Sequence, residues 1–501
     1  MRLNSLTKLL KRVALPCLLS VACLAGNSHA SDHASLNIGM QLEPPHLDPT
    51  AGAAGAIDAV TYANIFEGLT RIGAHGEVLP ALARSWKVSP DGLSYTFYLA
   101  KGVQFHDGSP FSADDVKFSL DRARGDGSTN AQKPLFSAIK EVVAVAPNEV
   151  RVDLLRQEGS LLFNLGWGDA VIVSRQSAKG NRKHPIGTGP FQFSRWVKGQ
   201  EIQLQRFDHY WGSPAKLDTV RFKVIADPNA AIAAVMAGDV DAYPGFPAPE
   251  ALGHLEADPR FKVFAGSSEG ETILAMNNKA GPLADVRVRR AVSMAIDKQA
   301  LVEGAMYGYG TPITSHFAPH HPAALDLAAE TPFDVREAKH LLKQAGYEDG
   351  FTATLKLPPP SYARRGGELI ASDLSKIGIK LKIVPVEWAQ WLADVFKGKN
   401  YEFTIVSHTE PMDIGIYARK DYYFNYDSAE FDGVVKQLNA ASDTQARYSL
   451  LGEAQRIIAR DAVNAYLFQL ANVSVWNAKL EGMWKDAPIQ AIDVTHVHWQ
   501  D

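Results

Sequence analysis

Cysteine is almost absent from this chain of 501 residues. It occurs twice, at Cys17 and Cys23, and both positions lie within the first 30 residues. If that segment is removed, the remaining protein has no thiol, no disulfide and no thiolate metal site. A disulfide framework and a cysteine-based zinc site are therefore both excluded after processing.

The first 30 residues have the order of a secretory signal peptide. The basic flank consists of Arg2, Lys8, Lys11 and Arg12. An apolar run over 13–25 and a small-x-small pattern ending at Ala30 follow. The run is too short to span a bilayer. We expect cleavage after Ala30, and amino-terminal sequencing of the exported protein that begins at Met1 instead would contradict this.

A lipid anchor at Cys23 is disfavoured, because Ser20 stands where a lipoprotein signal usually has leucine. No later stretch is long and apolar enough to span a membrane. Losing four basic residues with the signal peptide leaves 47 of the 51 basic residues against 55 acidic ones. Without a basic stretch to follow phosphates, nucleic acid is not an expected partner. The sequence predicts an exported, soluble protein, which we expect to be monomeric.

The motifs of common enzyme classes are missing as well. The chain has no GxSxG elbow, HExxH, P-loop or CxxC pair. His106 and Asp107 are adjacent on a predicted turn, without a nucleophile. His316, His320 and His321 share a proline-containing loop, which is a poor scaffold for converging metal ligands. We therefore expect no catalytic site, no cofactor and no metal, and a secreted hydrolase is the disfavoured alternative.

The stretch 185–212, PIGTGPFQFSRWVKGQEIQLQRFDHYWG, predicts an antiparallel hairpin. Phe191 and Phe193 share one face of the first strand, and Ile202 and Leu204 share one face of the second. The turn between them contains a glycine that can take a positive φ.

Other segments carry helical and strand patterns. Residues 81–122 predict turns, a strand and a helix capped by Ser112. Apolar spacing predicts a helix over 56–69, and residues 272–297 predict a strand followed by a helix. Residues 334–396 alternate helix and strand, which indicates α/β units.

These motifs carry a family resemblance. GTGPF at 187–191, YWG at 210–212 and DVRVRRA at 285–291 resemble the extracytoplasmic solute-binding proteins of peptide-type ABC importers (solute-binding family 5). The resemblance covers residues 35–500. It implies a two-lobed α/β clamshell of the type II periplasmic-binding-protein kind, resembling cluster C, with an extra small domain in the first lobe. It also implies a periplasmic protein that captures a solute and presents it to inner-membrane permease subunits.

The resemblance further implies domain boundaries. They are 1–30 for the signal peptide, 31–74, 185–268 and 476–501 for lobe I, 75–184 for the inserted domain, and 269–475 for lobe II. A buried strand is expected over 466–475. Crossings near 265–272 and near 470–478 would form the hinge.

A loop after the predicted strand 403–407 is the candidate ligand anchor. The peptide-binding relatives usually have Gly-Trp-x-x-Asp here, and the aspartate pairs with the amino terminus of the peptide. In this chain Ser407 and His408 replace Gly-Trp, and Glu410 falls nearest that aspartate, with Asp413 three residues on. A buried ammonium must be paired to stay charged. The resemblance therefore predicts that Glu410 anchors a cationic group, supported by Asp413.

The other predicted ligand-binding side chains are His408, Trp388, Glu43, Arg419 and Tyr417. Trp388 would supply an aromatic wall and Arg419 would bind a carboxylate, whereas Glu43 lies in a loop that borders the cleft in the family. Core packing or a solvated surface remains the alternative. The predicted cargo is a short peptide or peptide-like amine; the alternatives are a metal chelate, an opine or another non-peptide solute. A sensor or chaperone with the same fold also remains open.

Overall fold

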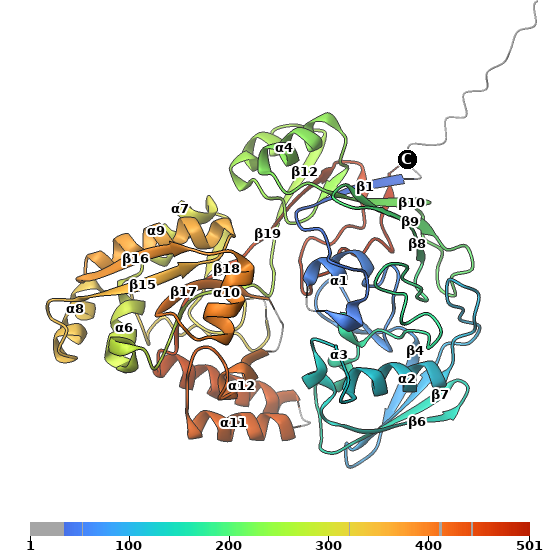
Figure 1. Ribbon diagram of the computed structural model, residues 1–501, viewed down its shortest axis with the longest axis horizontal. Helices are drawn as coiled ribbons and strands as arrows, with labels where there is room; N and C mark the ends of the chain where they lie inside the picture. Colours follow the sequence, from blue (N-terminus) through green and yellow to red (C-terminus); the bar gives the residue numbers. More distant parts are fainter. Residues whose placement is uncertain (1–34, 53, 320, 410–412, 442–443, 501) are drawn as a thin grey trace, which may run out of the picture.

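The computed structural model describes residues 35–500 except 53, 320, 410–412 and 442–443, so the predicted signal peptide lies outside the described residues. Figure 1 shows two lobes side by side, each built on its own large sheet. A mixed α/β architecture with two lobes was expected from the sequence, and it is confirmed.

Lobe I contains a seven-stranded sheet in the order β12-β19-β11-β1-β10-β9-β8. The strands are β1 (Ser35–Met40), β8 (Phe191–Val197), β9 (Glu201–Arg206), β10 (Thr219–Val224), β11 (Ala242–Tyr243), β12 (Phe261–Gly266) and β19 (Asn472–Asn477). The helices are α1 (Gly55–Thr61), α4 (Pro228–Ala237) and α5 (Leu252–Glu256). β1 runs parallel to β10 and β11, whereas β8, β9 and β10 are antiparallel.

The predicted hairpin is β8–β9. Phe191, Ile202 and Leu204 are fully buried, so their shared face packs into the core of lobe I. Gly199 takes the positive φ of 72° that the connecting turn requires. The period-2 pattern therefore identified both strands and the face that is buried.

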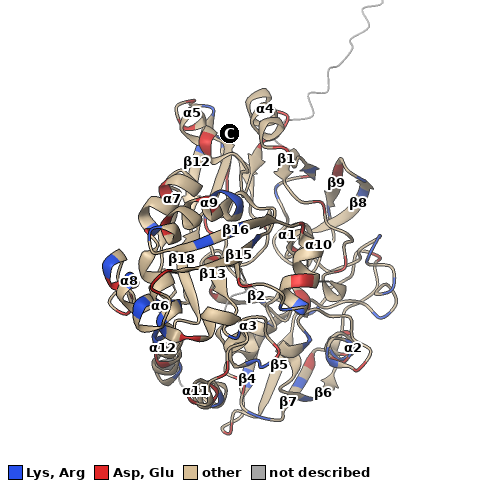
Figure 2. Cartoon of the chain, turned by 60° about the vertical axis from the view of Figure 1, so that its left-hand side comes forward, with Lys and Arg blue, Asp and Glu red and all other residues tan. Residues whose placement is uncertain are grey.

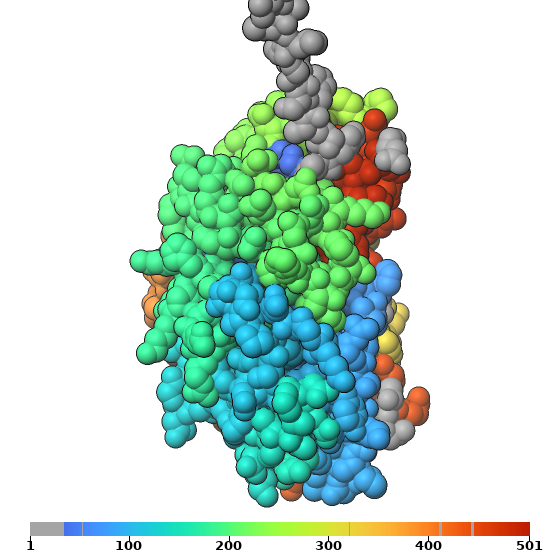
Figure 3. All heavy atoms as spheres, turned by 90° about the vertical axis from the view of Figure 1, so that its right-hand side faces the viewer, coloured from blue at the N-terminus to red at the C-terminus, as the bar shows by residue number. Residues whose placement is uncertain are grey.

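The segment 75–184 contains a separate four-stranded antiparallel sheet in the order β4-β5-β7-β6. Its elements are β4 (Ala83–Val88), β5 (Ser94–Leu99), β6 (Ile139–Ala146), β7 (Glu149–Leu154), α2 (Ala113–Arg124) and α3 (Leu161–Asn164). α2 packs Val116 and Leu120 against Phe97 and Val142 of the sheet. In Figure 3 these light-blue and teal residues occupy the lower part of the molecule, directly below the green residues of lobe I.

Ser112 caps α2 as predicted. Its hydroxyl accepts from the backbone N–H of Asp114 at 3.3 Å, and the Asp115 carboxylate accepts from the backbone N–H of Ser112 at 3.0 Å. Because an alanine cannot satisfy this helix end, we expect Ser112→Ala to lower the free energy of unfolding by about 1 kcal/mol. Ser213 is exposed and lies outside every helix and strand, so Ser213→Ala is the control, for which we expect a change within about 0.5 kcal/mol. Equal effects in urea denaturation would contradict the capping role.

Lobe II contains a six-stranded sheet in the order β14-β18-β13-β17-β15-β16. The strands are β13 (Glu271–Met276), β14 (Gly310–Pro312), β15 (Phe351–Leu357), β16 (Ile379–Pro385), β17 (Phe403–His408) and β18 (Asn464–Leu470). The helices α6 (Val286–Ala295), α7 (Lys298–Met306), α8 (Val335–Gln344) and α9 (Ser361–Ser375) share a core with Leu274 and Met276. The helices α10 (Trp388–Trp391), α11 (Ala429–Ala440) and α12 (Thr444–Arg460) cover the opposite face, which carries Ile273 and Ala275.

Two crossings connect the large sheets. β12 of lobe I leads into β13 of lobe II, and β18 of lobe II leads into β19 of lobe I. The strand predicted over 466–475 is thus two strands of different sheets, separated at Ala471. This break lies within the range 470–478 where the second crossing was expected. The remaining domain boundaries stay a proposal. Two short pairs, β2 (Thr70–Ile72) with β3 (Val78–Pro80) and β20 (Leu480–Glu481) with β21 (His498–Trp499), complete the fold.

The helix predicted over 56–69 is shorter than expected. α1 ends at Thr61, and Ala63 has a φ of 56°. The reason is tertiary, because the amide side chain of Asn64 donates to the carbonyl of Ile492 at 2.8 Å and accepts from the N–H of Val494 at 3.0 Å. These contacts with a distant segment replace the helical turn that local spacing favoured.

Charged side chains of both signs are scattered over both lobes (Figure 2). Within the part of the chain that the structure describes, no helix combines the length and the apolar character needed to cross a membrane.

Candidate ligand-binding site between the lobes

A pocket lies where the two lobes meet. It is narrow in this structure, with about 40 Å³ open to the centres of water-sized molecules. Its lining is Gly55, Asp58, Tyr62, Gln132, Trp167, Gly168, Asp169, Thr409, Ile489 and Gln490. Thr409 follows β17 of lobe II, and the other residues come from α1, from the segment 75–184 and from the carboxyl-terminal segment. The pocket is therefore closed by groups from both lobes.

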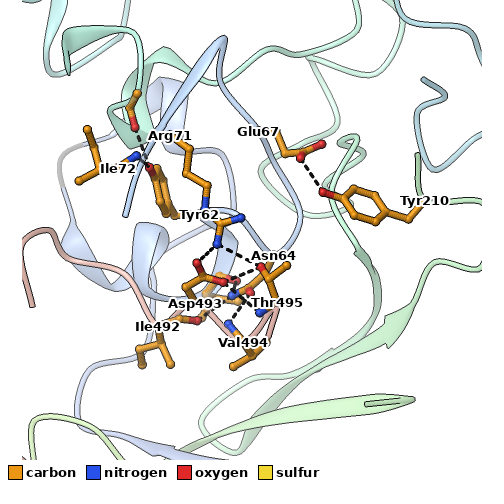
Figure 4. Close-up of polar contacts among 12 residues, drawn as sticks. Tyr62, Asn64, Glu67, Arg71, Ile72, Tyr210, Ile492, Asp493, Val494 and Thr495 are labelled. Carbon is orange, nitrogen blue, oxygen red and sulfur yellow. Dashed lines mark hydrogen bonds and ion pairs between the residues drawn. The ribbon is translucent and has the colours of Figure 1, made fainter. Parts of the chain in front are cut away.

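The carboxyl-terminal segment is tied to lobe I next to this pocket (Figure 4). Arg71 forms an ion pair with Asp493, whose side chain is 2% exposed, and Asp493 also accepts from the Thr495 hydroxyl at 2.5 Å. The contacts of Asn64 with residues 492 and 494 add to this attachment. Together they fix the chain just before it, where Ile489 and Gln490 line the pocket.

Tyr62 forms a fixed wall of the pocket. Its hydroxyl donates to the carbonyl of Gly166 at 2.8 Å and accepts from the N–H of Ile72 at 2.8 Å. Burial raises the pKa of the Tyr62 phenol, so the hydroxyl stays protonated. Gly166 directly precedes Trp167, which lines the same pocket. The Tyr62 hydroxyl therefore also holds the segment that carries Trp167.

Glu67 links the GTG and YWG motifs to each other through hydrogen bonds. Its carboxylate accepts from the Thr188 hydroxyl at 2.8 Å, the Tyr210 hydroxyl at 2.9 Å and the Trp211 indole N–H at 2.9 Å. Burial raises the pKa of Glu67, and the three donors act in the opposite direction. The motifs thus fasten the hairpin to the chain beneath it, and their role is structural. The sequence analysis missed Glu67, which no local pattern singles out.

The lobes touch across the pocket. The Gln490 amide donates to the Thr409 hydroxyl at 2.5 Å. The Gln490 side chain packs against Gly55, where any larger residue would clash, because a Cβ at Gly55 would lie 1.4 Å from the Gln490 Oε1 atom. A second contact joins Gly159 to α12, since a Cβ at Gly159 would lie 2.7 Å from Nη1 of Arg447. The structure therefore shows the lobes in contact.

Two carboxylates, the half-buried Asp58 and the buried Asp169, line the lobe I side of the pocket. Asp169 is 4% exposed, and the Oδ1 atoms of both residues are buried without a hydrogen-bond partner. Burial raises the pKa of Asp58 well above its usual value, and the charge of Asp169 adds to the rise. Burial also raises the pKa of Asp169 to about 7, although the Trp167 side chain donates to it. The sequence offered two weak signals for this pair, namely an acidic residue next to Ile57 in a predicted helix and the run Trp167-Gly168-Asp169. Neither Asp58 nor Asp169 was among the predicted site residues.

The predicted anchoring loop is only partly described. Glu410 lies outside the described residues. Asp413 begins a 3-10 helix (Asp413–Ala418), and its carboxylate lies 2.9 Å from Nε2 of His316 and 3.5 Å from Nδ1 of His408. Burial opposes ionisation of Asp413, but these histidines outweigh it and lower its pKa. Asp413 is thus already paired within lobe II.

His316 is clamped between two carboxylates. Its Nδ1 lies 2.9 Å from Oε1 of Glu271, an ion pair whose alignment is too poor for a hydrogen bond, and its Nε2 faces Asp413. Burial lowers the pKa of His316, but the two carboxylates outweigh this and raise it to about 10. Potential ligand atoms of Glu271, His316 and Asp413 lie within 4.8 Å of one another, which is close enough to surround a metal ion. Because the imidazole uses opposite nitrogens toward the two acids, the arrangement suits an imidazolium better than a metal ion.

The other predicted site residues lie in varied settings. His408 is buried and its Nε2 lies 2.9 Å from the Tyr423 hydroxyl. Tyr417 is buried in lobe II, with its hydroxyl 3.0 Å from that of Tyr466. Trp388 is 38% exposed and meets Trp391 edge-on.

Glu43 accepts from the Trp196 indole at 2.8 Å and from the N–H of Gly199 at 2.9 Å, so it supports the β8–β9 turn. Arg419 is half-exposed, with its guanidinium over the ring of Tyr422. Of the predicted side chains that the structure describes, none is among the residues that line the interlobe pocket.

Comparison with known proteins agrees with this architecture. A dipeptide-binding protein of Escherichia coli (strain K12) is 32% identical over 360 residues, which cover 65% of this chain and 66% of that protein. The glutathione-binding protein GsiB of Salmonella choleraesuis (strain SC-B67) is 30% identical over 463 residues, covering 87% and 89%. The periplasmic binding protein DppA from Helicobacter pylori, solved in complex with peptide STSA, has a TM-score of 0.82 at 27% identity, over 93% of this chain and 98% of that chain.

A sequence model of the bacterial extracellular solute-binding proteins, family 5 Middle, matches residues 77–413, more than half of the chain. That match runs from the four-stranded sheet through the hinge to the loop that holds Asp413. Two sheets joined by two crossings, an interlobe pocket and these similarities lead to one conclusion: the chain belongs to family 5 of the bacterial extracellular solute-binding proteins.

Proposed function

We propose that this protein captures a short peptide or peptide-like amine between its lobes in the periplasm and delivers it to an ABC permease in the inner membrane. No bond is made or broken. Binding requires the two lobes to close on the ligand, so the affinity reflects released water and paired charges set against the lost freedom of the ligand.

One observation carries this proposal, namely that the pocket is lined from both lobes and holds two carboxylates, each with a buried oxygen and neither with an ion-pair partner among the described residues. The described lining contains no Lys, Arg or His. Such a lining favours a cationic ligand, because a buried charge is stable only when it is paired. Similar proteins named for dipeptides and glutathione support a peptide-like cargo, since both carry an amine. A metal chelate or another non-peptide solute is the second candidate, favoured by Ser407 and His408 in place of Gly-Trp.

The direct test is mass spectrometry of small molecules released by denaturing the natively purified protein. We expect a compound with a primary amine. Gly168→Leu should abolish its recovery, because a Cβ at this position already lies 2.4 Å from Oδ1 of Asp58. Gly253→Leu is the matched control, since Gly253 is exposed in α5 and a Cβ there meets nothing within 4 Å. A released compound without an amine would overturn the proposed cargo.

A further inference from the structure

We propose that Asp58 and Asp169 form a cation subsite in lobe I that binds a primary ammonium group of the ligand, an inference that rests on the proposed capture of a peptide-like amine.

The two carboxylates are brought together by parts of the chain that are distant in sequence. Asp58 lies on α1, and Asp169 lies in the 3-10 turn Gly168–Ala170 of the segment 75–184. The Asp58 carboxylate packs directly on Gly168, the residue before Asp169, because Oδ1 would be 2.4 Å from a Cβ there. Gly168 therefore permits the close approach of the pair.

The pair has the features of a built site. Asp169 is 4% exposed and lines the pocket with an oxygen that has no hydrogen-bond partner, and Asp58 presents a second such oxygen. Neither residue takes part in any ion pair among the described residues. Burial and mutual repulsion disfavour the charged forms of the two carboxyl groups, and a bound cation favours those forms again.

A primary ammonium fits this place better than a larger cation. It is compact and offers three donors, which can reach both carboxylates at once. Tyr62 and Trp167 line the same pocket and present aromatic rings, whose faces attract cations. On the other side, Thr409 and Gln490 are neutral polar groups that can form hydrogen bonds with the amide of a ligand. The site thus separates a cation-binding end in lobe I from a neutral end at the interlobe contact.

The test uses protein freed of its ligand by unfolding and refolding, with calorimetric titration of a panel of Ala-X dipeptides and the same panel N-acetylated. For the parent, we expect acetylation to weaken binding of the preferred dipeptide by about ten- to a hundredfold, the range of a charge-assisted contact. In Asp58→Asn and in Asp169→Asn the free dipeptide should bind about tenfold or more weakly, and the acetylation penalty should fall to about threefold or less. Asp349→Asn, at an exposed acid outside the lining of the interlobe pocket, should behave as the parent.

The design separates competing outcomes. An acetylation penalty that stays unchanged in both Asn variants overturns this subsite while leaving capture of dipeptides intact. If the penalty disappears in Glu410→Gln instead, the lobe II loop is the anchor and this inference is wrong. If no panel member binds the parent, the proposed peptide cargo fails together with the subsite. Stabilisation of the parent by Ca²⁺ alone, lost in Asp169→Asn, would show a metal site in place of an ammonium site.

A second variant guards against misfolding. Gly168→Ala keeps both carboxylates but forces Asp58 to move, because the added methyl would overlap its Oδ1. We expect it to lower the affinity for the free dipeptide by more than that for the acetylated one. Equal losses for the two ligands would contradict a role of the Asp58 position in binding the amine.

Discussion

Replacing His316 with asparagine is expected to lower the free energy of unfolding by about 3–5 kcal/mol, the cost of removing one partner from a buried ion pair. His316 is 3% exposed, and the acids on either side, Glu271 and Asp413, are largely buried as well. Without the imidazolium, both acids face each other across a poorly solvated space. The rings of Phe317 and Tyr417 pack edge-on against His316 and carry no charge. Of the described groups around the acids, only His408, 3.5 Å from Asp413, can therefore offset part of the loss. Urea denaturation of parent and variant measures the loss.

The effect should depend on pH. The pKa of His316 is raised from 6.5 to about 10 on folding, so its stabilising contribution is complete below pH 6.5 and disappears as the pH rises through about 10. Asp413 behaves in the opposite way, because its pKa is lowered, and its contribution is lost as the pH falls below 3.8. Burial raises the pKa of Glu271 from 4.5 to about 7, so this residue destabilises the folded state increasingly as the pH rises from 4.5 to about 7, and by a constant amount above pH 7.

We therefore expect the stability difference between parent and His316→Asn to be largest between about pH 5 and 6.5 and to shrink toward pH 10. His75→Asn is the matched control, because His75 is exposed in the turn between β2 and β3; its effect should stay within about 0.5 kcal/mol. A His316 variant whose deficit is the same at pH 6 and pH 10 would rule out the imidazolium clamp.

Arg71→Met is expected to cost about 3 kcal/mol of unfolding free energy and to loosen the carboxyl-terminal wall of the pocket. The variant keeps the apolar stem of the side chain but leaves Asp493, which is 2% exposed, without its cation. Because the Arg71 side chain is 21% exposed, we place the cost at the lower end of the range for buried pairs. Hydrogen exchange should show faster exchange of the amides at 489–495, since this segment is held by that pair.

The double variant Arg71→Met/Asp493→Asn should recover part of the loss, because no unpaired charge then remains buried. Arg195→Met is the control at an exposed pair with Glu201, where the expected cost is about 0–1 kcal/mol. If Arg71→Met and Arg195→Met prove equally mild, the ion pair with Asp493 does not hold the carboxyl-terminal segment.

Local pattern was enough to predict much of the fold. The alternation at Phe191, Ile202 and Leu204 identified a hairpin and its buried face, and Ser112 with Asp115 identified the start of α2. Patterns of this kind succeed because neighbouring residues in one element share one environment. The helix beyond Thr61 failed because Asn64 bonds to a segment more than 400 residues away. The break at Ala471 was missed because both strands around it are apolar.

The candidate site was harder to predict, because contacts between distant parts of the chain bring its residues together. Asp58 and Asp169 meet only because the segment 75–184 folds back against α1, and neither residue belongs to a motif. Asp413 was singled out by resemblance, yet its availability depends on His316, which a proline-containing loop brings from far along the chain. Sequence identified the acids of a familiar loop, whereas tertiary contacts decide which acids remain unpaired.

The central claim is that ligand is held between two lobes that close around it, and small-angle X-ray scattering tests it most directly. The protein would be stripped of ligand by unfolding and refolding, then measured before and after the small molecules released in that step are added back. Because the interlobe contact of Gln490 with Thr409 belongs to the closed state, we expect the radius of gyration to decrease on addition while the circular dichroism stays the same. Identical scattering curves, with calorimetry confirming that the added molecules bind, would contradict closure of the lobes on the ligand.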